Sequence, residues 1–492
     1  MTEGRRLARH SAVNGLALVI FGLVTFSVTP FLFRHLSTAE VGVWVLITTV
    51  QVTGRGLGSL LDLGLQQSLI ARVASADHED RHGRFGGAMT VLATTSTIAT
   101  TALLVSAPWI VGLFHIPASL EADATTTLRL VALQLGLDLL CTGPASVLEG
   151  LRRYELRRAI DVVRYLIWFG LVIALVSNGG GIVSVGIAAL VSTVVFAAAL
   201  FVAVARAGIR PRRGSPRAEL REGLPLLLLR LAGVGNRQLD KLVLGAVVGT
   251  IAVAGFDVAE KTDLVAATVL GIATSALIPA AAERRDESDV LRSTAHLTTR
   301  WSSTLAAPLA GFSIGAAAPI AMLIAGEHLD GAAAAIRWLG LSTLLAVSYS
   351  ASFEMSIGLS AARRLAPLAG VGFVANLVGT IVLAQRYGLP GSTAATTLTA
   401  LAMTPFVLHR TSASVHSSPG RLLRAAAPGL TIGVLVAVTS WLATGGDDGT
   451  EALLRAAVVG GVVGLIGLGI TFATTRQHLF PRPEDATDGA AR

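Results

Sequence analysis

The feature that most constrains this chain is a series of apolar runs long enough to cross a lipid bilayer. A helix needs about 20 mostly apolar residues for this, since it rises about 1.5 Å per residue. Fourteen such runs occur, at approximately 12–34, 41–66, 86–111, 125–149, 158–177, 182–205, 223–247, 252–280, 299–325, 333–358, 365–385, 390–409, 422–443 and 454–475. The first run is too long for a secretory signal, so we interpret it as an uncleaved span. The pattern predicts an all-α polytopic membrane protein with about 14 transmembrane helices.

The composition excludes a soluble enzyme. Only 14% of the 492 residues are charged and 52% are hydrophobic, whereas soluble domains carry about 25% charged residues. The chain contains no G-x-x-x-x-G-K-[ST] loop, no H-E-x-x-H motif and no Cys/His cluster. Its single cysteine, Cys141, excludes an internal disulfide and a multi-cysteine metal site. We therefore expect no cofactor, no metal site and no ATP hydrolysis.

The net charge of +8 comes from arginines that gather in alternate loops. Loops on one side contain Arg5, Arg6, Arg9, Arg72, Arg81, Arg84, Arg152, Arg153, Arg157, Arg158, the run from Arg206 to Arg221, Arg284, Arg285, Arg292, Arg363, Arg364, Arg410, Arg421 and Arg424. Loops on the other side carry Arg34, Arg386 and Arg455 at their edges. Basic loops stay in the cytoplasm, so these charges orient the chain and do not indicate nucleic-acid binding. Both termini are predicted to be cytoplasmic, and the polar tail at 477–492 is predicted to be disordered.

The two halves of the chain share a weak internal similarity. At an offset of 212, residues 36–44 lie over residues 248–256, and both segments are a turn that opens an even-numbered span. Spans 1–6 then correspond to spans 7–12, although chance similarity among apolar helices could produce the same match. The predicted organisation is an N-terminal lobe at 1–210, a C-terminal lobe at 211–415 and two added helices at 416–476. Repeats of this kind are typical of secondary transporters, whose substrate binds between the halves.

Charged side chains also fall inside the predicted spans. A charge at the bilayer centre costs from about 2.5 to more than 10 kcal/mol, so such residues usually face a polar cavity or a partner. In span 2, Gln51, Arg55, Asp62 and Gln66 recur at +4, +7 and +4, which would place them on one face of a helix. Further charges are Arg129 and Asp138 in span 4, Arg230, Arg237, Asp240 and Lys241 in span 7, and Asp257 and Lys261 in span 8.

In a two-lobe transporter these helices would line a central cleft that is net positive. Arginine binds pyrophosphate and acidic sugars through paired hydrogen bonds, so such a cleft would suit an anionic glycan carrier. The predicted substrate-binding residues are Arg55, Arg230, Arg237, Lys241 and Lys261. The alternative is that Arg55–Asp62, Arg237–Asp240 and Asp257–Lys261 are internal ion pairs that only hold spans together.

Energy for transport has to come from an ion gradient, the membrane potential or consumption of the product, because the chain has no ATP-binding loop. Asp138, Asp240 and Asp257 are the predicted sites for a coupling H⁺ or Na⁺. Asp62, near the predicted cytoplasmic mouth, and Pro30, which would bend the first span, are candidates for gating. Charged residues at span edges, such as Arg164, are expected to be interface anchors.

Several segments resemble a known family. Residues 32–44 (Leu-Phe-Arg-His-Leu-Ser-Thr-Ala-Glu-Val-Gly-Val-Trp), residues 61–65 (Leu-Asp-Leu-Gly-Leu) and Arg72 resemble the first two spans of bacterial polysaccharide flippases. These flippases belong to the multidrug/oligosaccharidyl-lipid/polysaccharide (MOP) exporter superfamily. Residues 239–249 are similar to the seventh span of that family, and a Phe256/Ala259/Lys261 pattern and Pro279 follow.

The resemblance implies a multi-pass protein of a bacterial cytoplasmic membrane. By alternating access, it would move a polyprenyl-pyrophosphate-linked oligosaccharide from the inner to the outer leaflet. Its expected partners are the lipid-linked glycan, membrane lipids, H⁺ or Na⁺, and other membrane proteins of polysaccharide assembly.

Three other functions are compatible with a polytopic chain. A multidrug or toxin cation antiporter of the same superfamily would need an acidic, aromatic-rich pocket, whereas aromatic residues make up only 5% of this chain. A peptidoglycan-precursor flippase would also have 14 spans and a cationic cleft. A membrane-embedded glycosyltransferase or glycan polymerase would need a sizeable external loop for its catalytic residues, and the predicted external loops are short. We therefore expect a transporter and not an enzyme.

Overall fold

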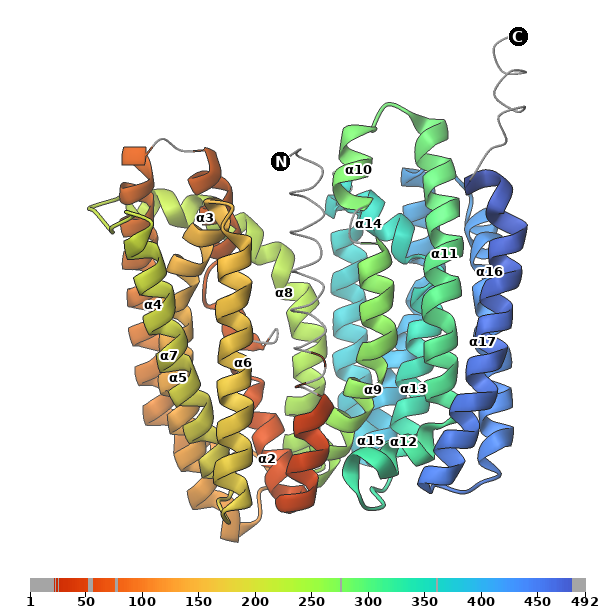
Figure 1. Ribbon diagram of the computed structural model, residues 1–492, viewed down its shortest axis with the longest axis horizontal. Helices are drawn as coiled ribbons and strands as arrows, with labels where there is room; N and C mark the ends of the chain where they lie inside the picture. Colours follow the sequence, from red (N-terminus) through yellow and green to blue (C-terminus); the bar gives the residue numbers. More distant parts are fainter. Residues whose placement is uncertain are drawn as a thin grey trace. The chain divides into compact units, whose positions relative to one another are not determined.

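A computed structural model describes residue 22, residue 24 and residues 26–51, 56–75, 78–274, 277–359 and 362–479. Within these ranges the regular secondary structure is helical throughout (Figure 1). The chain forms two compact units, which divide between Ala254 and Gly255. The predicted all-α polytopic class is confirmed.

After a helical stretch at residues 26–35, the first unit contains seven labelled α-helices and two short 3₁₀ helices among its described residues, before α9 begins at its end. They are α2 (Thr38–Thr48), η2 (Leu57–Leu60), α3 (Leu65–Ser75), α4 (His78–Gly112), η3 (Ala118–Leu120), α5 (Glu121–Gly150), α6 (Tyr154–Ser177), α7 (Ile182–Arg206) and α8 (Pro216–Val247). Helix α9 (Thr250–Thr274) begins at the end of this unit and lies mostly in the second.

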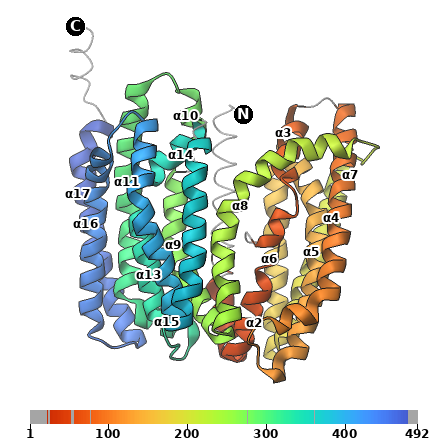
Figure 2. The ribbon, with the colours of Figure 1, turned by 180° about the vertical axis from the view of Figure 1, so that it is seen from behind.

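The second unit continues from α9 with eight further helices in the described ranges (Figure 2). They are α10 (Leu277–Glu283), α11 (Ser288–Gly315), α12 (Ala317–Ala325), α13 (Ala332–Ala346), α14 (Ser350–Gly358), α15 (Ala362–Ser414), α16 (Pro419–Thr444) and α17 (Thr450–Leu479). Helices α11 and α16 pack backbone to backbone, because a Cβ atom added at Gly311 would overlap the carbonyl oxygen of Gly433.

The helices reproduce most of the predicted spans. In the described part of the chain, seven helices are long and apolar enough to cross a membrane, or up to nine if two bent helix pairs each count as one span. Helix α15 contains both runs predicted at 365–385 and 390–409, joined at Gly388, whose φ of 61° interrupts the helical backbone. The total of fourteen spans and the cytoplasmic position of both termini stay predictions.

Span 2 was predicted as one helix over 41–66, and this is wrong. Helix α2 ends at Thr48, a 3₁₀ turn follows at η2, and helical structure resumes only at α3. Glycines explain the break: a Cβ at Gly58 would overlap the carbonyl oxygen of Val50, and Gly64 has a φ of 76° in close contact with Gly223. The spacing of +4, +7 and +4 in this segment therefore does not define a helix face.

Another predicted span bends at a proline. Helices α11 and α12 meet at 77°. Pro319 lies four residues after Gly315, so its ring would collide with the Gly315 carbonyl in a straight helix, and its nitrogen cannot donate a hydrogen bond. Helix α11 accordingly ends at Gly315.

Helix α5 is the most enclosed span of the first unit. Of its apolar window, 78% is buried inside the protein, compared with 17% for α6. Helix α4 packs against it closely: the Ser96 hydroxyl donates to the carbonyl oxygen of Gly136 over 2.8 Å. A polar side chain on the inner faces of α5 is therefore buried in protein and not in lipid.

The compact units divide later than the lobe boundary predicted at residues 210–211. Helix α8 belongs to the first unit because its beginning is fastened to α3: Arg72 forms an ion pair with Glu219 at 2.8 Å, and Gly64 contacts Gly223. The internal repeat on which the predicted boundary rested stays a prediction.

Candidate functional site

The predicted substrate-binding residues are only partly described by the structure. Arg55 lies outside the described residues. Arg230 and Arg237 lie on α8, seven residues apart, but their side chains are also outside the described part. Lys241 follows on the same helix and is buried, with an exposed fraction of 6%, and it has interaction partners. A cationic binding surface formed by these residues stays a prediction.

The two gating candidates have different local environments. Asp62 is buried, and its Oδ1 accepts a hydrogen bond from the Gly64 backbone N–H over 2.9 Å. This contact, from an aspartate to the amide two residues later, stabilises the turn that precedes α3. Pro30 lies in helical backbone that continues to His35. A gating role for either residue stays a prediction.

The best-defined polar site of the first unit is an ion pair between α5 and α6. Asp138 and Arg164 approach through two pairs of atoms, Oδ1–Nη1 at 2.8 Å and Oδ2–Nη2 at 3.0 Å. Both side chains are buried, with exposed fractions of 3% and 8%. Arg164 Nη2 also donates to the hydroxyl of Thr193 on α7 over 2.8 Å. One guanidinium group therefore links three helices, through an ion pair and a hydrogen bond to Asp138 and a hydrogen bond to Thr193.

This ion pair belongs to a longer network of hydrogen bonds across the first unit. The side-chain amide of Gln134 donates to Asp138 Oδ2 over 3.4 Å, and Gln51 donates to Gln134 over 3.3 Å. Gln51 lies directly after α2, at the break in span 2. This hydrogen-bond network therefore connects the break in span 2 to the buried ion pair between α5 and α6.

On the side of Arg164, a second arginine and an aromatic ring extend the network. The guanidinium carbon of Arg164 lies 4.5 Å from the centroid of the Phe196 ring, and that of Arg157 lies 5.3 Å from it. Arg157 also pairs with Asp161 and, at 3.8 Å, with Glu149. The positive charges are thus balanced by carboxylates and by a ring face.

Sequence analysis missed the role of Arg164, which is not an interface anchor at a span edge. Helix α6 begins at Tyr154, so Arg164 lies ten residues, or about 15 Å, into the helix. The available signal was a pair of opposite charges, Asp138 and Arg164, in two consecutive spans.

In the second unit the predicted charges lie on α9. Lys261 Nζ lies 2.5 Å from Asp257 Oδ2, and the lysine is the more exposed partner, at 22% against 7%. Asp263 Oδ1 accepts a hydrogen bond from the Thr343 hydroxyl on α13 over 2.6 Å. Together with Glu260, residues 257–263 contain three acids and one base. This stretch is therefore acidic overall, whereas span 8 was expected to contribute positive charge.

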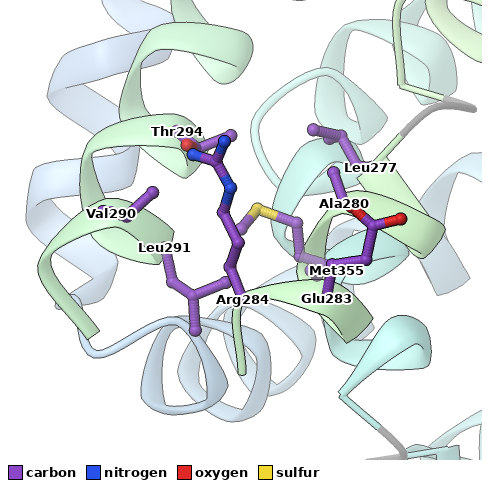
Figure 3. A pocket seen from close by; sticks show the side chains of 9 residues that line it. Leu277, Ala280, Glu283, Arg284, Val290, Leu291, Thr294 and Met355 are labelled. Atoms are coloured by element: carbon purple, nitrogen blue, oxygen red, sulfur yellow. The ribbon is translucent and has the colours of Figure 1, made fainter. Parts of the chain in front are cut away.

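A cavity of about 260 Å³ lies elsewhere in the second unit, between α10, α11 and α14 (Figure 3). Leu277, Leu291 and Met355 form part of its apolar lining, and Arg284 lies along it. Ligand pockets usually measure about 300–1,000 Å³, so this cavity is too small for an oligosaccharide. None of the predicted site residues lines it. In the described ranges, no group of three or more His, Cys, Asp or Glu residues could hold a metal ion.

Solved structures share the fold of this chain. A lipid II flippase MurJ in an inward closed conformation is 11% identical, with a TM-score of 0.78 over 95% of this chain and 99% of that protein. A multidrug resistance MATE transporter of the MOP superfamily, in an inward-facing conformation, is 16% identical, with a TM-score of 0.63 over 81% of this chain and 99% of that protein. At these identities the likeness concerns the fold alone.

A family model provides the relationship at the level of sequence. The model described as polysaccharide biosynthesis protein matches residues 31–334, more than half of the chain. Among curated proteins, none matches. The matched region includes α2 to α12, and hence both polar sites described above. The chain therefore belongs to the polysaccharide biosynthesis protein family, and it has the multi-helix fold of the MurJ and MATE transporters.

Proposed function

We propose that the protein translocates a polyprenyl-pyrophosphate-linked oligosaccharide from the inner to the outer leaflet of a bacterial cytoplasmic membrane by alternating access. The observation that carries this proposal is the family match over residues 31–334. The fold shared with a lipid II flippase is consistent with a substrate that has a lipid tail and a polar head. A water-filled route would carry the glycan while the tail stays in the bilayer.

The proposed binding group for the pyrophosphate is the basic series on α8. Arg230, Arg237 and Lys241 follow one another at +7 and +4, which places them along one side of that helix. Arginine forms paired hydrogen bonds with phosphate oxygens and stays charged at every physiological pH. The cationic central route predicted from the sequence remains part of this proposal.

The proposed coupling residues are Asp240 and Asp257. Asp138 fits this role less well, because a proton or sodium ion there would compete with the two contacts from Arg164. Asp257 faces Lys261 of the same helix, at the edge of an acidic stretch of α9. The nearby carboxylates of Glu260 and Asp263 add negative charge that attracts a cation to this stretch.

Transport by purified protein in vesicles tests the proposal. The measurement is the fraction of a fluorescent polyprenyl-pyrophosphate oligosaccharide that starts in the inner leaflet and becomes accessible to a membrane-impermeant glycosidase added outside. We expect the wild-type protein to equilibrate the substrate, Arg237→Gln to slow transport, and Arg285→Gln, which removes an exposed loop arginine, to leave it unchanged. Equal rates for vesicles with and without the protein would overturn the proposal.

The same vesicles separate the two related functions. The acidic stretch of α9 and the MATE-like fold favour a cation antiporter as the second candidate. Uptake of a cationic dye that depends on a proton or sodium gradient, without movement of the glycan lipid, would establish that function. Transport of lipid II in preference to the oligosaccharide lipid would instead identify a peptidoglycan-precursor flippase.

A further inference from the structure

The segment from the end of α7 to the first turns of α8, residues 206–222 and called the linker below, combines a fixed backbone with exposed positive charge. Residues 206–222 contain six arginines and two glutamates. All six arginines are exposed: Arg206, Arg210, Arg212, Arg213, Arg217 and Arg221. One of the two glutamates, Glu219, is buried and paired with Arg72 at 2.8 Å. The solvent-facing side of the linker is therefore strongly basic.

The beginning of this linker is held by apolar and polar contacts. Ile209 is buried, with an exposed fraction of 2%, in a core that includes Phe85 of α4 and Leu200 of α7. The next residue, Arg210, donates its backbone N–H to Nδ1 of His82 over 3.1 Å. The chain thus leaves α7 along a defined path (Figure 1).

The middle of the linker lies directly on the backbone of α4. The Arg212 N–H donates to the carbonyl oxygen of His82 over 3.0 Å. A Cβ atom at Gly86 would overlap the Arg212 carbonyl, and one at Gly214 would overlap the Gly83 carbonyl. Only glycine allows the two backbones to come this close, so the glycines of α4 provide the surface on which the linker packs.

A basic loop that merely orients a membrane protein needs no fixed conformation, because the positive-inside effect depends on the number of charges. Here the backbone is anchored at Ile209, Arg210, Arg212, Gly214 and Glu219, and the arginine side chains stay free to reach outward. Such an arrangement loses less conformational freedom when it binds a ligand than a mobile loop would.

We propose that this linker, residues 206–222, is a binding platform for anionic phospholipid head groups of the cytoplasmic leaflet. Its chemistry fits phosphate esters at a membrane surface: several arginines lie close together at the end of a spanning helix, on the side predicted to be cytoplasmic. Clusters of four to eight basic residues beside a transmembrane helix are typical of such binding. The bound lipid would hold this end of the first unit at the level of the head groups.

Titration of the full-length protein in neutral detergent tests this platform. The probes are short-chain phosphatidylglycerol, short-chain phosphatidylcholine and inorganic phosphate, and the readout is the dissociation constant from intrinsic tryptophan fluorescence. We expect saturable binding of phosphatidylglycerol and none of phosphatidylcholine. The triple variant Arg210→Gln/Arg212→Gln/Arg213→Gln should weaken this binding at least about tenfold.

A matched control loses the same charge from the adjoining ends of α15 and α16. Arg410, Arg421 and Arg424 are also exposed and lie on the side predicted to be cytoplasmic. Their triple replacement by glutamine should leave the dissociation constant unchanged within about twofold, since the platform is intact. Gly86→Val, which keeps every charge but displaces the linker from α4, should weaken binding several-fold in protein whose melting temperature is unchanged.

Three results would overturn the proposal. The platform variant could bind phosphatidylglycerol as wild type does. The control variant could be weakened equally, which would show that only total charge matters. Inorganic phosphate could displace the lipid at equal concentration, which would identify a site for a free anion and not for a head group.

Discussion

The two polar sites of the molecule differ in how their charges are paired. In the first unit, Asp138 and Arg164 come from two helices and are both almost fully buried, and Arg164 also donates to Thr193 on α7. In the second unit, Asp257 and Lys261 come from the same helix, one turn apart, and the lysine keeps 22% of its side chain exposed. The first pair ties helices together, whereas the second ties one helix to itself.

This difference determines what each carboxylate can do. A buried cross-helix pair resists the loss of either partner, because the charge left behind is neither hydrated nor paired. In the same-helix pair the lysine is partly exposed, so its charge can be hydrated if the acid is lost. We therefore keep Asp257, and not Asp138, as the proposed coupling residue.

The largest expected effect is at Arg164. Arg164→Leu leaves Asp138 as an unpaired buried charge, and breaking such a pair costs about 3–5 kcal/mol of folding free energy. The melting temperature in detergent and the yield of monodisperse protein should both fall sharply, whereas Arg285→Gln should change neither. Asp138→Leu/Arg164→Leu removes both charges and should recover much of the loss. If the double variant is as unstable as the single one, the lost packing of the arginine and not its charge is responsible.

A smaller effect is expected at the third partner of the cross-helix site. Thr193→Val preserves the shape of the side chain but removes the oxygen that accepts from Arg164, and a hydrogen bond to a charged group contributes about 1.5–3 kcal/mol. The melting temperature should fall, but less than for Arg164→Leu. An unchanged value would mean that Arg164 is held by Asp138 alone.

The same-helix site should separate stability from transport. Asp257→Asn keeps the size of the buried side chain and removes its charge beside the partly exposed Lys261, so we expect a smaller loss of stability than for Arg164→Leu. Transport in vesicles should nevertheless become insensitive to the ion gradient, because the proposed cation-binding carboxylate is gone. A variant that keeps gradient-dependent transport would remove Asp257 from the coupling site.

The smallest effect is expected for an exposed pair that serves as the reference. Arg84 and Asp80 are 2.8 Å apart at i and i+4, with 27% and 58% of their side chains exposed. Pairs of this kind contribute about 0.3–0.5 kcal/mol, and added salt screens them. Asp80→Asn should leave the melting temperature within measurement error at high salt. A clear fall in the melting temperature at high salt would show that exposure does not make this pair weaker than Asp138–Arg164 and Asp257–Lys261.

Sequence analysis located most helices because apolar length is a property of consecutive residues. The runs predicted at 158–177 and 182–205 correspond closely to α6 and α7. The interruption of span 2 was not predicted, although its glycines are visible in the sequence. Their effect depends on which backbone lies opposite, and that neighbour, Gly223, is more than 150 residues away.

The residue types of the candidate site were predictable, and so was the Asp257–Lys261 pair within one helix, but the contacts between helices were not. Three acids were selected because a charge inside a span requires a partner or a cavity. Arg164 was assigned to a span edge, because the sequence did not show that helix α6 begins at Tyr154, before the apolar run predicted at 158–177. Asp263 gains its contact from Thr343 on another helix, which no spacing within one span indicates.

The sequence by itself determined the class of the protein and the position of most spans. Each of these follows from the cost of placing charge or free backbone groups in hydrocarbon, which acts on every segment separately. Only the tertiary structure decided that Arg164 neutralises Asp138, that span 2 is interrupted, and that the basic linker lies on the glycines of α4. Those outcomes depend on the rotation and approach of neighbouring helices, which packing selects among faces of similar composition.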